Sequence, residues 1–144
     1  MGMNHFGELS VLSNIAKPTI SVITNIGTAH IGNLGSREGI RQAKMEILDG
    51  MVGNQVIVNN DDDMMASVVD SLREKYEVIT VSIDEESTYR AINLEYNVFS
   101  SKFDIVDNAN DIKVNVGGRA YIYNSLVAYA IGEVLDIEDR LIRE

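Results

Sequence analysis

The 144-residue sequence contains no cysteine and only one proline. Without cysteine, the chain has no disulfide framework, no thiolate metal site and no thiol nucleophile. No apolar run approaches the about 20 residues that a membrane-spanning helix needs, and no charged-then-apolar leader opens the sequence. We therefore expect a cytoplasmic protein.

Basic residues are also scarce, with 12 Lys and Arg against 22 Asp and Glu, which gives a formal net charge of −10. This charge argues against a nucleic-acid groove and against binding to an anionic membrane. Hydrophobic residues make up 45% of the chain, which is typical of a globular protein. The length is sufficient for one domain with a core, which we place at residues 1–135, with 136–144 beginning a connection to a further domain.

Helical and strand patterns alternate in the first half of the chain, which predicts an α/β fold with a mostly parallel, doubly wound sheet. The helix before Pro18 ends there because the residue preceding a proline is pushed out of the helical region, and Ser36 can cap the next helix. The expected helices are Phe6–Ala16, Ser36 to about Asp49, and Asp62–Tyr76; the expected strands are Thr19–Thr24, Gln55–Val58 and Glu77–Ser82.

The second half has a different character. Three short, partly alternating runs separated by Ser, Asn and Asp predict a small antiparallel β patch, at Tyr89–Tyr96, Lys102–Val106 and Asp111–Val116. Tyr123–Leu135 then reads as a helix that is apolar nearly all round and therefore buried.

Two polar loops follow predicted strands, Asn25–Ser36 and Asn59–Asp63. Ligands of open α/β sheets bind outside the carboxyl ends of the strands, so His30 and the pair Asp61 and Asp62 could share a rim and hold Mg²⁺. Alternatively, His30 is a loop histidine bonded to backbone and the aspartates cap the next helix.

Lys44 lies within an apolar arc of its predicted helix, together with Ile40, Ala43 and Ile47. A lysine in such a position either extends its amine to solvent, shifts its pKa or takes part in chemistry. Helical side chains lean toward the N-terminus, so Lys44 can reach toward His30. The sequence contains no G-x-x-x-x-G-K-[ST] phosphate loop and no cluster of zinc ligands.

Seven motifs occur in order across nearly the whole chain: G-M-N-H-x-G-E at Gly2–Glu8, T-N-I-G-x-A-H at Thr24–His30, G-S-x-E-G-I at Gly35–Ile40, A-K-x-E-I at Ala43–Ile47, N-x-D-D at Asn59–Asp62, Y-R-A-x-N at Tyr89–Asn93 and Y-N-x-L at Tyr123–Leu126. This ordered set resembles the central, ATP-binding domain of the Mur ligases, a P-loop-NTPase-like domain that would here be truncated at its N-terminus. The first motif favours the branch that adds D-alanyl-D-alanine to UDP-N-acetylmuramoyl-tripeptide.

The resemblance implies roles for specific residues. In this family ATP phosphorylates a carboxylate, and an amine then attacks the acyl phosphate to form an amide. His30 would help to hold Mg²⁺, and Lys44, typically carbamylated in the family, would ligate or position metal as an anion. Both would be catalytic. The remaining implied residues are Asn59, Asp61 and Asn124 on the ATP side, and Asn4 and His5 on the substrate side.

Some family features are not in this sequence. The phosphate loop and a metal-binding glutamate would lie upstream of Met1, and the usual His-Asn pair is Ala120-Tyr121 here. We therefore expect a fragment that is inactive by itself. Alternatives are another Mur-type ligase, such as a folylpolyglutamate or cyanophycin synthetase, or a non-catalytic interaction module. An exposed sheet edge would also favour a homodimer.

Overall fold

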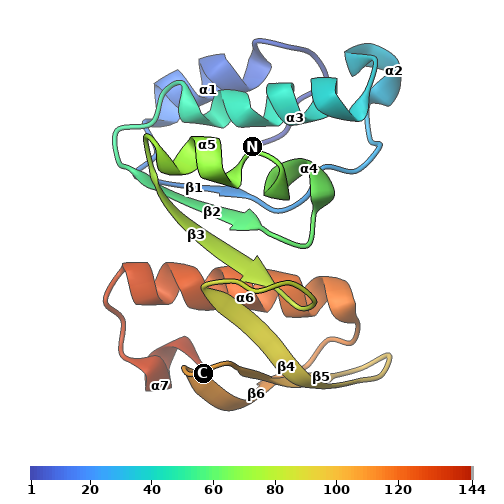
Figure 1. The fold of residues 1–144 in the computed structure, drawn as a ribbon, viewed down its shortest axis with the longest axis vertical. Helices are drawn as coiled ribbons and strands as arrows, with labels where there is room; N and C mark the ends of the chain where they lie inside the picture. The colour runs from blue at the N-terminus through green and yellow to red at the C-terminus, as the bar shows by residue number, and fades with distance from the viewer. Residues whose placement is uncertain (144) are drawn as a thin grey trace. The chain divides into compact units, whose positions relative to one another are not determined.

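The computed structural model describes residues 1–143, whose six strands hydrogen-bond in the order β1-β2-β3-β4-β5-β6 (Figure 1). The chain divides into two compact units. The first comprises Met1–Val58 and Asp62–Val78; the second comprises Asn59–Asp61 and the chain from Ile79 onward. No helix among residues 1–143 is long and apolar enough to cross a membrane.

The elements alternate as the sequence predicts. Up to the third strand they are α1 (Glu8–Ala16), β1 (Ile20–Ile23), α2 (Ile31–Leu34), α3 (Arg37–Met45), the 3-10 turn η1 (Glu46–Leu48), β2 (Gln55–Asn59), α4 (Asp63–Ala66), α5 (Val69–Arg73) and β3 (Glu77–Ser82). After it come β4 (Tyr89–Tyr96), β5 (Ser101–Ile105), β6 (Ala109–Val114), α6 (Arg119–Val134) and α7 (Asp139–Ile142). Strands β1 and β2 pair in parallel, as do β3 and β4, whereas β4, β5 and β6 pair antiparallel. The predicted α/β sheet with an antiparallel patch is confirmed.

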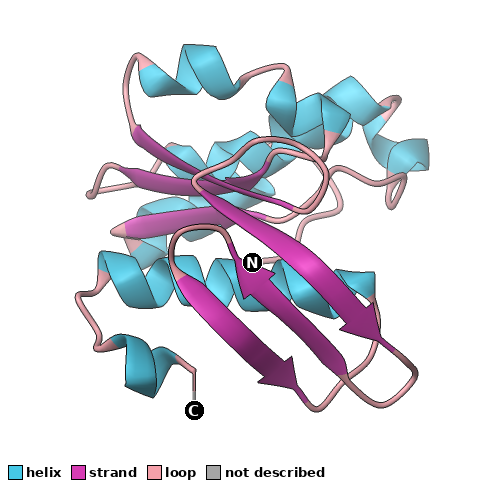
Figure 2. Cartoon of the chain, turned by 60° about the horizontal axis from the view of Figure 1, so that its bottom comes forward, coloured by secondary structure: helices cyan, strands magenta, loops and turns pink. Residues whose placement is uncertain are grey.

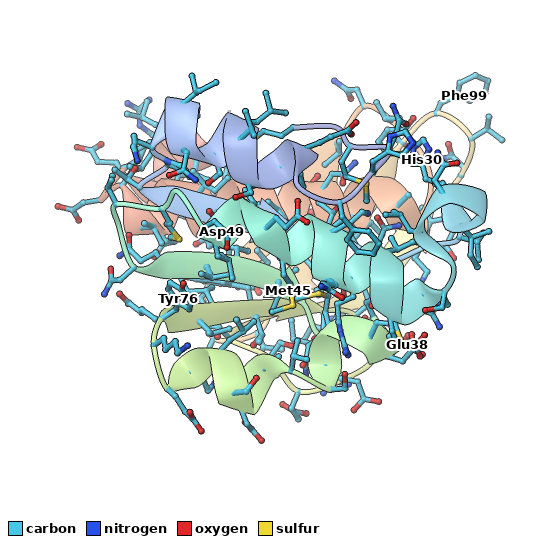
Figure 3. The ribbon with its side chains drawn as sticks, turned by 90° about the horizontal axis from the view of Figure 1, so that it is seen from above. His30, Glu38, Met45, Asp49, Tyr76 and Phe99 are labelled. Carbon is cyan, nitrogen blue, oxygen red and sulfur yellow. The ribbon has the colours of Figure 1, made fainter. Side chains whose placement is uncertain are left out.

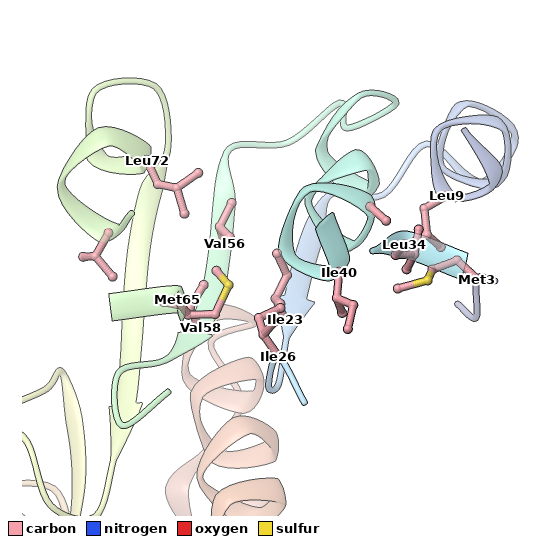
Figure 4. Packing of buried hydrophobic residues seen from close by; sticks show 12 residues of the cluster. Met3, Leu9, Ile23, Ile26, Leu34, Ile40, Val56, Val58, Met65 and Leu72 are labelled. Atoms are coloured by element: carbon pink, nitrogen blue, oxygen red, sulfur yellow. The ribbon is translucent and has the colours of Figure 1, made fainter. Parts of the chain in front are cut away.

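The core of the first unit lies between its helices and strands, where apolar side chains from α1, β1, α3, β2 and α5 meet (Figure 4). Ile40 and Ala43 of α3 are buried in it. The predicted start of α3 is correct. The Ser36 side chain accepts a hydrogen bond from the Gly39 amide, which satisfies one of the backbone donors that a helix leaves unpaired at its N-terminus. This cap fixes the helix that carries Lys44.

Two predictions for the first unit are wrong. The single helix expected at Asp62–Tyr76 is two short helices, α4 and α5, because Ser67 and Val68 interrupt it. The Ser67 hydroxyl donates to the Met64 carbonyl, a local bond that competes with helix continuation. The loop expected from Asn25 to Ser36 contains the one-turn helix α2, which is too short to give a periodic signal.

In the second unit, α6 packs against β4 and β5 (Figure 2). The helix begins at Arg119, four residues before its predicted start, after Gly118 in a backbone conformation with φ 118° that favours glycine. Its burial is one-sided: Ile122, Leu126 and Tyr129 are buried, whereas Tyr121 is exposed. The helix predicted at Tyr123–Leu135 as apolar nearly all round and therefore buried is buried along one side only, with Asn124 and Leu135 exposed. The single domain predicted at residues 1–135 stays a prediction.

Candidate functional site

One cleft of about 240 Å³ in the first unit contains both residues that the sequence singles out, His30 and Lys44. The rest of its lining comes from the start of the chain, from α1, from the end of β1 and from α3 and η1: Met1, Gly2, Met3, Leu9, Val22, Ile23, Thr24, Ala29 and Ile47. A lysine and a histidine from separate elements therefore share one concave surface at the carboxyl end of β1, where ligands of α/β sheets bind.

Lys44 is half-buried in this cleft, and its Nζ donates a hydrogen bond to the Asn25 carbonyl at 2.5 Å. Burial lowers the pKa of Lys44, and the nearby Asp62 carboxylate opposes that shift in part. A lowered pKa gives a larger fraction of neutral amine at a given pH, which is the form that reacts with electrophiles. The alternative interpretation, in which the amine simply extends to solvent, therefore does not describe Lys44.

His30 has an exposed side chain that forms no hydrogen bond within residues 1–143. Its backbone lies in the left-handed region, with φ 64°, and its carbonyl accepts hydrogen bonds from the Asn33 and Leu34 amides of α2. Non-glycine residues rarely adopt this conformation, and such positions gather at functional sites. The imidazole is thus free to contact a ligand, contrary to the alternative in which it bonds to backbone. Figure 3 shows His30 beside α2.

The loop after β1 is fixed by a clamp on Ile26, which is 1% exposed. The Ile26 amide donates to Asp62 Oδ2 at 2.6 Å, and its carbonyl accepts from Arg37 Nη2 at 3.0 Å. Asp62 Oδ1 also caps α4 by accepting from the Met65 amide, and Arg37 pairs with Asp63. Both carboxylates thus bond to the chain itself; Asp62 caps the next helix, as the alternative predicts, whereas Asp63 forms an ion pair instead. Periodicity gave no signal for Arg37, which occupies the variable position of the G-S-x-E-G-I motif.

Asn4 and His5 are exposed and lie in a turn before α1. Both backbone amides donate to Glu8 Oε2, at 2.6 and 3.1 Å, and His5 Nδ1 lies 3.2 Å from Glu8 Oε1. The two Asn4 and His5 amide bonds lower the pKa of Glu8. Glu46 in turn accepts from the Gly7 amide. The glutamate of the G-M-N-H-x-G-E motif therefore shapes the turn, and the Asn4 side chain forms no hydrogen bond within residues 1–143.

In the second unit, Asp61 accepts bonds from four donors. The Ile83 and Glu85 amides lie 2.6 and 2.9 Å from its oxygens, the Asp84 amide lies 3.1 Å away and the Tyr123 hydroxyl 2.6 Å away. Burial raises the pKa of Asp61, but these hydrogen bonds outweigh it and hold the pKa below 3.8. Burial and donation to Asp61 raise the pKa of Tyr123 to about 12.

Asn59 is 8% exposed, and its Oδ1 accepts from the Asp61 amide. Asn124 is exposed on α6, with no hydrogen bond from its side chain among residues 1–143, so its amide is available to a ligand. On the same helix, Arg119 forms an ion pair with Asp84 and lies over the Tyr123 ring, 5.8 Å from its centroid. All three residues predicted to contact ATP thus belong to the second unit, and two of them, Asn59 and Asp61, belong to one hydrogen-bonded network. Their ATP contacts stay predictions.

The unmodified side chains of the cleft do not form a Mg²⁺ site. No group of three or more His, Asp and Glu side chains within residues 1–143 could hold a metal ion. Mg²⁺ prefers oxygen ligands, whereas the cleft offers one imidazole, and the Lys44 ammonium repels cations. The metal roles predicted for His30 and Lys44 depend on modification of the lysine or on oxygen ligands supplied by a bound molecule.

Comparison with known proteins extends the resemblance found in the motifs. A UDP-N-acetylmuramoyl-tripeptide–D-alanyl-D-alanine ligase of Bacillus subtilis is 31% identical over 137 residues, which cover 95% of this chain and 29% of that protein. A crystal structure of MurF from Acinetobacter baumannii matches 99% of this chain and 32% of its own, with a TM-score of 0.89 and 27% identity. MurF from Thermotoga maritima, solved in complex with ADP, shares the fold with a TM-score of 0.80 and 20% identity, over 97% of this chain and 33% of its own.

The chain thus spans about a third or less of the proteins it matches. Residues 1–132 match the family model described as the Mur ligase middle domain. That match covers all the elements through most of α6, including the cleft with His30 and Lys44. The chain belongs to the Mur ligase middle-domain family.

Proposed function

We propose that this chain acts as the central, ATP-binding part of a cytoplasmic ligase that adds D-alanyl-D-alanine to UDP-N-acetylmuramoyl-tripeptide. The carrying observation is the single cleft in which His30 and Lys44 meet the first residues of the G-M-N-H-x-G-E motif. The relative from Bacillus subtilis, which bears the name of that activity, supports this choice of substrates.

The proposed reaction has two steps. A carboxylate oxygen of the tripeptide attacks the γ-phosphorus of ATP, and ADP leaves. The amine of D-alanyl-D-alanine then attacks the acyl carbon, and phosphate leaves through a tetrahedral intermediate. Charge develops on the phosphoryl oxygens in the first step and on the acyl oxygen in the second, so preorganised donors near the cleft accelerate both. Mg²⁺ enters as the MgATP substrate.

We assign the residues as follows. His30 contacts the phosphoryl end of the substrates through its unpaired imidazole, and Asn4 and His5 contact the muramoyl peptide. Asn124 contacts the adenine, with Asn59 and Asp61 holding the loop beside the nucleotide. Lys44 is carbamylated: its neutral amine adds to CO₂ and releases a proton, which replaces a half-buried cation with an anion. The lowered pKa of Lys44 supports this step. A ¹³C-carbamate resonance under ¹³CO₂ that is absent from Lys44→Arg would test it.

The activity is testable in a chimera in which this chain replaces the aligned segment of the Bacillus subtilis ligase. With ATP, UDP-N-acetylmuramoyl-tripeptide and D-alanyl-D-alanine, we expect the pentapeptide product by mass spectrometry. The Lys44→Ala and His30→Ala chimeras should lose about 100-fold or more in rate while keeping the same melting temperature. The 144-residue chain alone should form no product, since it has no phosphate loop. A folded chimera without activity would refute the assignment.

A homodimer is a separate proposal. Strand β1 is the terminal strand in the hydrogen-bonded order of the described residues, so one of its edges is open to pair with a second copy. Sedimentation velocity over a range of concentrations would reveal such pairing. A single monomeric species at the highest concentration would exclude it.

A further inference from the structure

A second hollow in the first unit shares no residue with the His30–Lys44 cleft. It is a groove of about 640 Å³ with walls from the C-terminal part of α3 with η1 and from α5 with the turn after it. Figure 3 shows Met45 and Asp49 on the α3 side, Tyr76 on the α5 side, and Glu38 at the far end of α3. The volume is in the range of ligand sites rather than of packing defects.

The floor of the groove is apolar. Leu72 belongs to the core cluster, and Met45, Leu48 and Tyr76 are partly buried side chains packed against that cluster. The groove is thus a place where the core reaches the surface between two helices. A methionine and a tyrosine in such a floor adapt to aliphatic groups, and the tyrosine ring also attracts cations.

The rim of the groove is acidic. The carboxylates of Asp49 and Glu74 stand on opposite walls, are exposed, and form no hydrogen bond or ion pair within residues 1–143. Glu46 adds a third carboxylate, although both its oxygens already accept from Gly7. Lys75 is the single basic residue of the lining. The whole chain carries a formal charge of −10, so its field also attracts cations toward this rim.

We propose that this groove binds a basic, amphipathic peptide segment of a partner protein. An apolar side chain of the segment lies between Met45 and Leu72, and its lysine or arginine side chains pair with Asp49 and Glu74. This is the helix-in-groove mode of recognition, with charge complementarity at the rim. A second copy of this chain is a poorer occupant of this groove than a basic segment, because its own 12 Lys and Arg are outnumbered by 22 Asp and Glu, whereas the rim offers carboxylates. The proposal does not rest on the ligase activity.

The test uses this chain and a fluorescein-labelled peptide of about 14 lysine and leucine residues, amphipathic over four helical turns. We expect a saturable rise in anisotropy. The double variant Asp49→Asn/Glu74→Gln should raise Kd about tenfold, because two partly exposed ion pairs are lost. The matched control Glu38→Gln/Asp70→Asn removes the same charge outside the groove and should change Kd less than about twofold. Met45→Gln, which keeps the charge, should raise Kd about fivefold.

Circular dichroism of each variant establishes that it is folded. If the groove variant and the control variant raise the Kd for the peptide equally, only the net charge of the chain attracts the peptide, and the proposal is overturned. Unchanged binding by Met45→Gln, or the absence of saturable binding, would also overturn it. Stronger binding of a simple alkylamine than of the peptide would assign the groove to a small amphipathic amine and equally overturn it.

Discussion

Two adjacent aspartates, Asp62 and Asp63, should differ sharply in their effect on stability. Asp62→Ala removes the cap of α4, which costs about 1 kcal/mol. It also leaves the amide of Ile26, which is 1% exposed, without its 2.6 Å partner. An unpaired buried donor costs about 1–3 kcal/mol, so the expected loss in the free energy of unfolding is about 2–4 kcal/mol.

Asp63→Ala is the matched control. It removes the same kind of side chain one residue later, but that carboxylate is exposed and pairs with Arg37 at the surface. Because water and salt screen such a pair, its loss should have a much smaller effect. Arg37 keeps its bonds to the Ile26 carbonyl. The loss in the free energy of unfolding caused by Asp62→Asn should lie between those of the two alanine variants, because an amide side chain retains only one of the two acceptor oxygens.

Urea unfolding followed by circular dichroism measures these free energies, and hydrogen exchange of the Ile26 amide reports the clamp directly. We expect exchange at Ile26 to accelerate in Asp62→Ala and to stay unchanged in Asp63→Ala. Equal destabilisation by the two substitutions, or an Ile26 amide that stays protected without Asp62, would refute the clamp.

Four further predictions follow from other contacts. Tyr123→Phe should cost about 1 kcal/mol by removing the hydrogen bond to Asp61, measured by urea unfolding; an unchanged midpoint would contradict the 2.6 Å contact. The pKa of Asp61 is lower in the folded chain than its ordinary 3.8, so the contribution of this carboxylate to the free energy of unfolding is complete above pH 3.8 and is lost as the pH falls below that value. The substitution Asp61→Asn should therefore weaken the dependence of stability on pH in acid. The pKa of Tyr123 is raised from 10.0 to about 12, so the contribution of its hydroxyl to the free energy of unfolding is complete below pH 10 and is lost as the pH rises toward 12. The substitution Tyr123→Phe should remove this loss of stability in alkali. In competitive acetylation at about pH 9, Lys44 should react before Lys102, because burial lowers the pKa of Lys44 whereas Asp111 raises the pKa of Lys102. If mass spectrometry shows Lys102 acetylated first, the environment described for Lys44 in the cleft is wrong.

Local signals in the sequence predicted the parts of the fold that local physics determines. The Ser36 cap gave the start of α3, and the β-branched runs gave the parallel strands within a residue or two. Helical periodicity placed Lys44 on the apolar side of α3, and the structure brings it into the cleft of His30. These features depend on residues close together in the sequence, so a sequence pattern can predict them.

Contacts between distant residues were not predictable in this way. The clamp on Ile26 joins residues 11 and 36 positions away, through side chains bonding to backbone. Such bonds leave no periodic trace. The break between α4 and α5 depends likewise on Ser67, whose hydroxyl also accepts from Arg41 of α3 at 2.9 Å. Tertiary contacts of this kind override the helical pattern of Asp62–Tyr76.

The proposed function requires amide formation through an acyl phosphate. The most direct measurement uses the chimera with tripeptide substrate labelled with ¹⁸O in the reacting carboxylate. Because that carboxylate oxygen leaves with the phosphoryl group, we expect one ¹⁸O in inorganic phosphate for each amide formed, together with ADP. Label in AMP, or product formation with no label in phosphate, would rule out an acyl-phosphate intermediate.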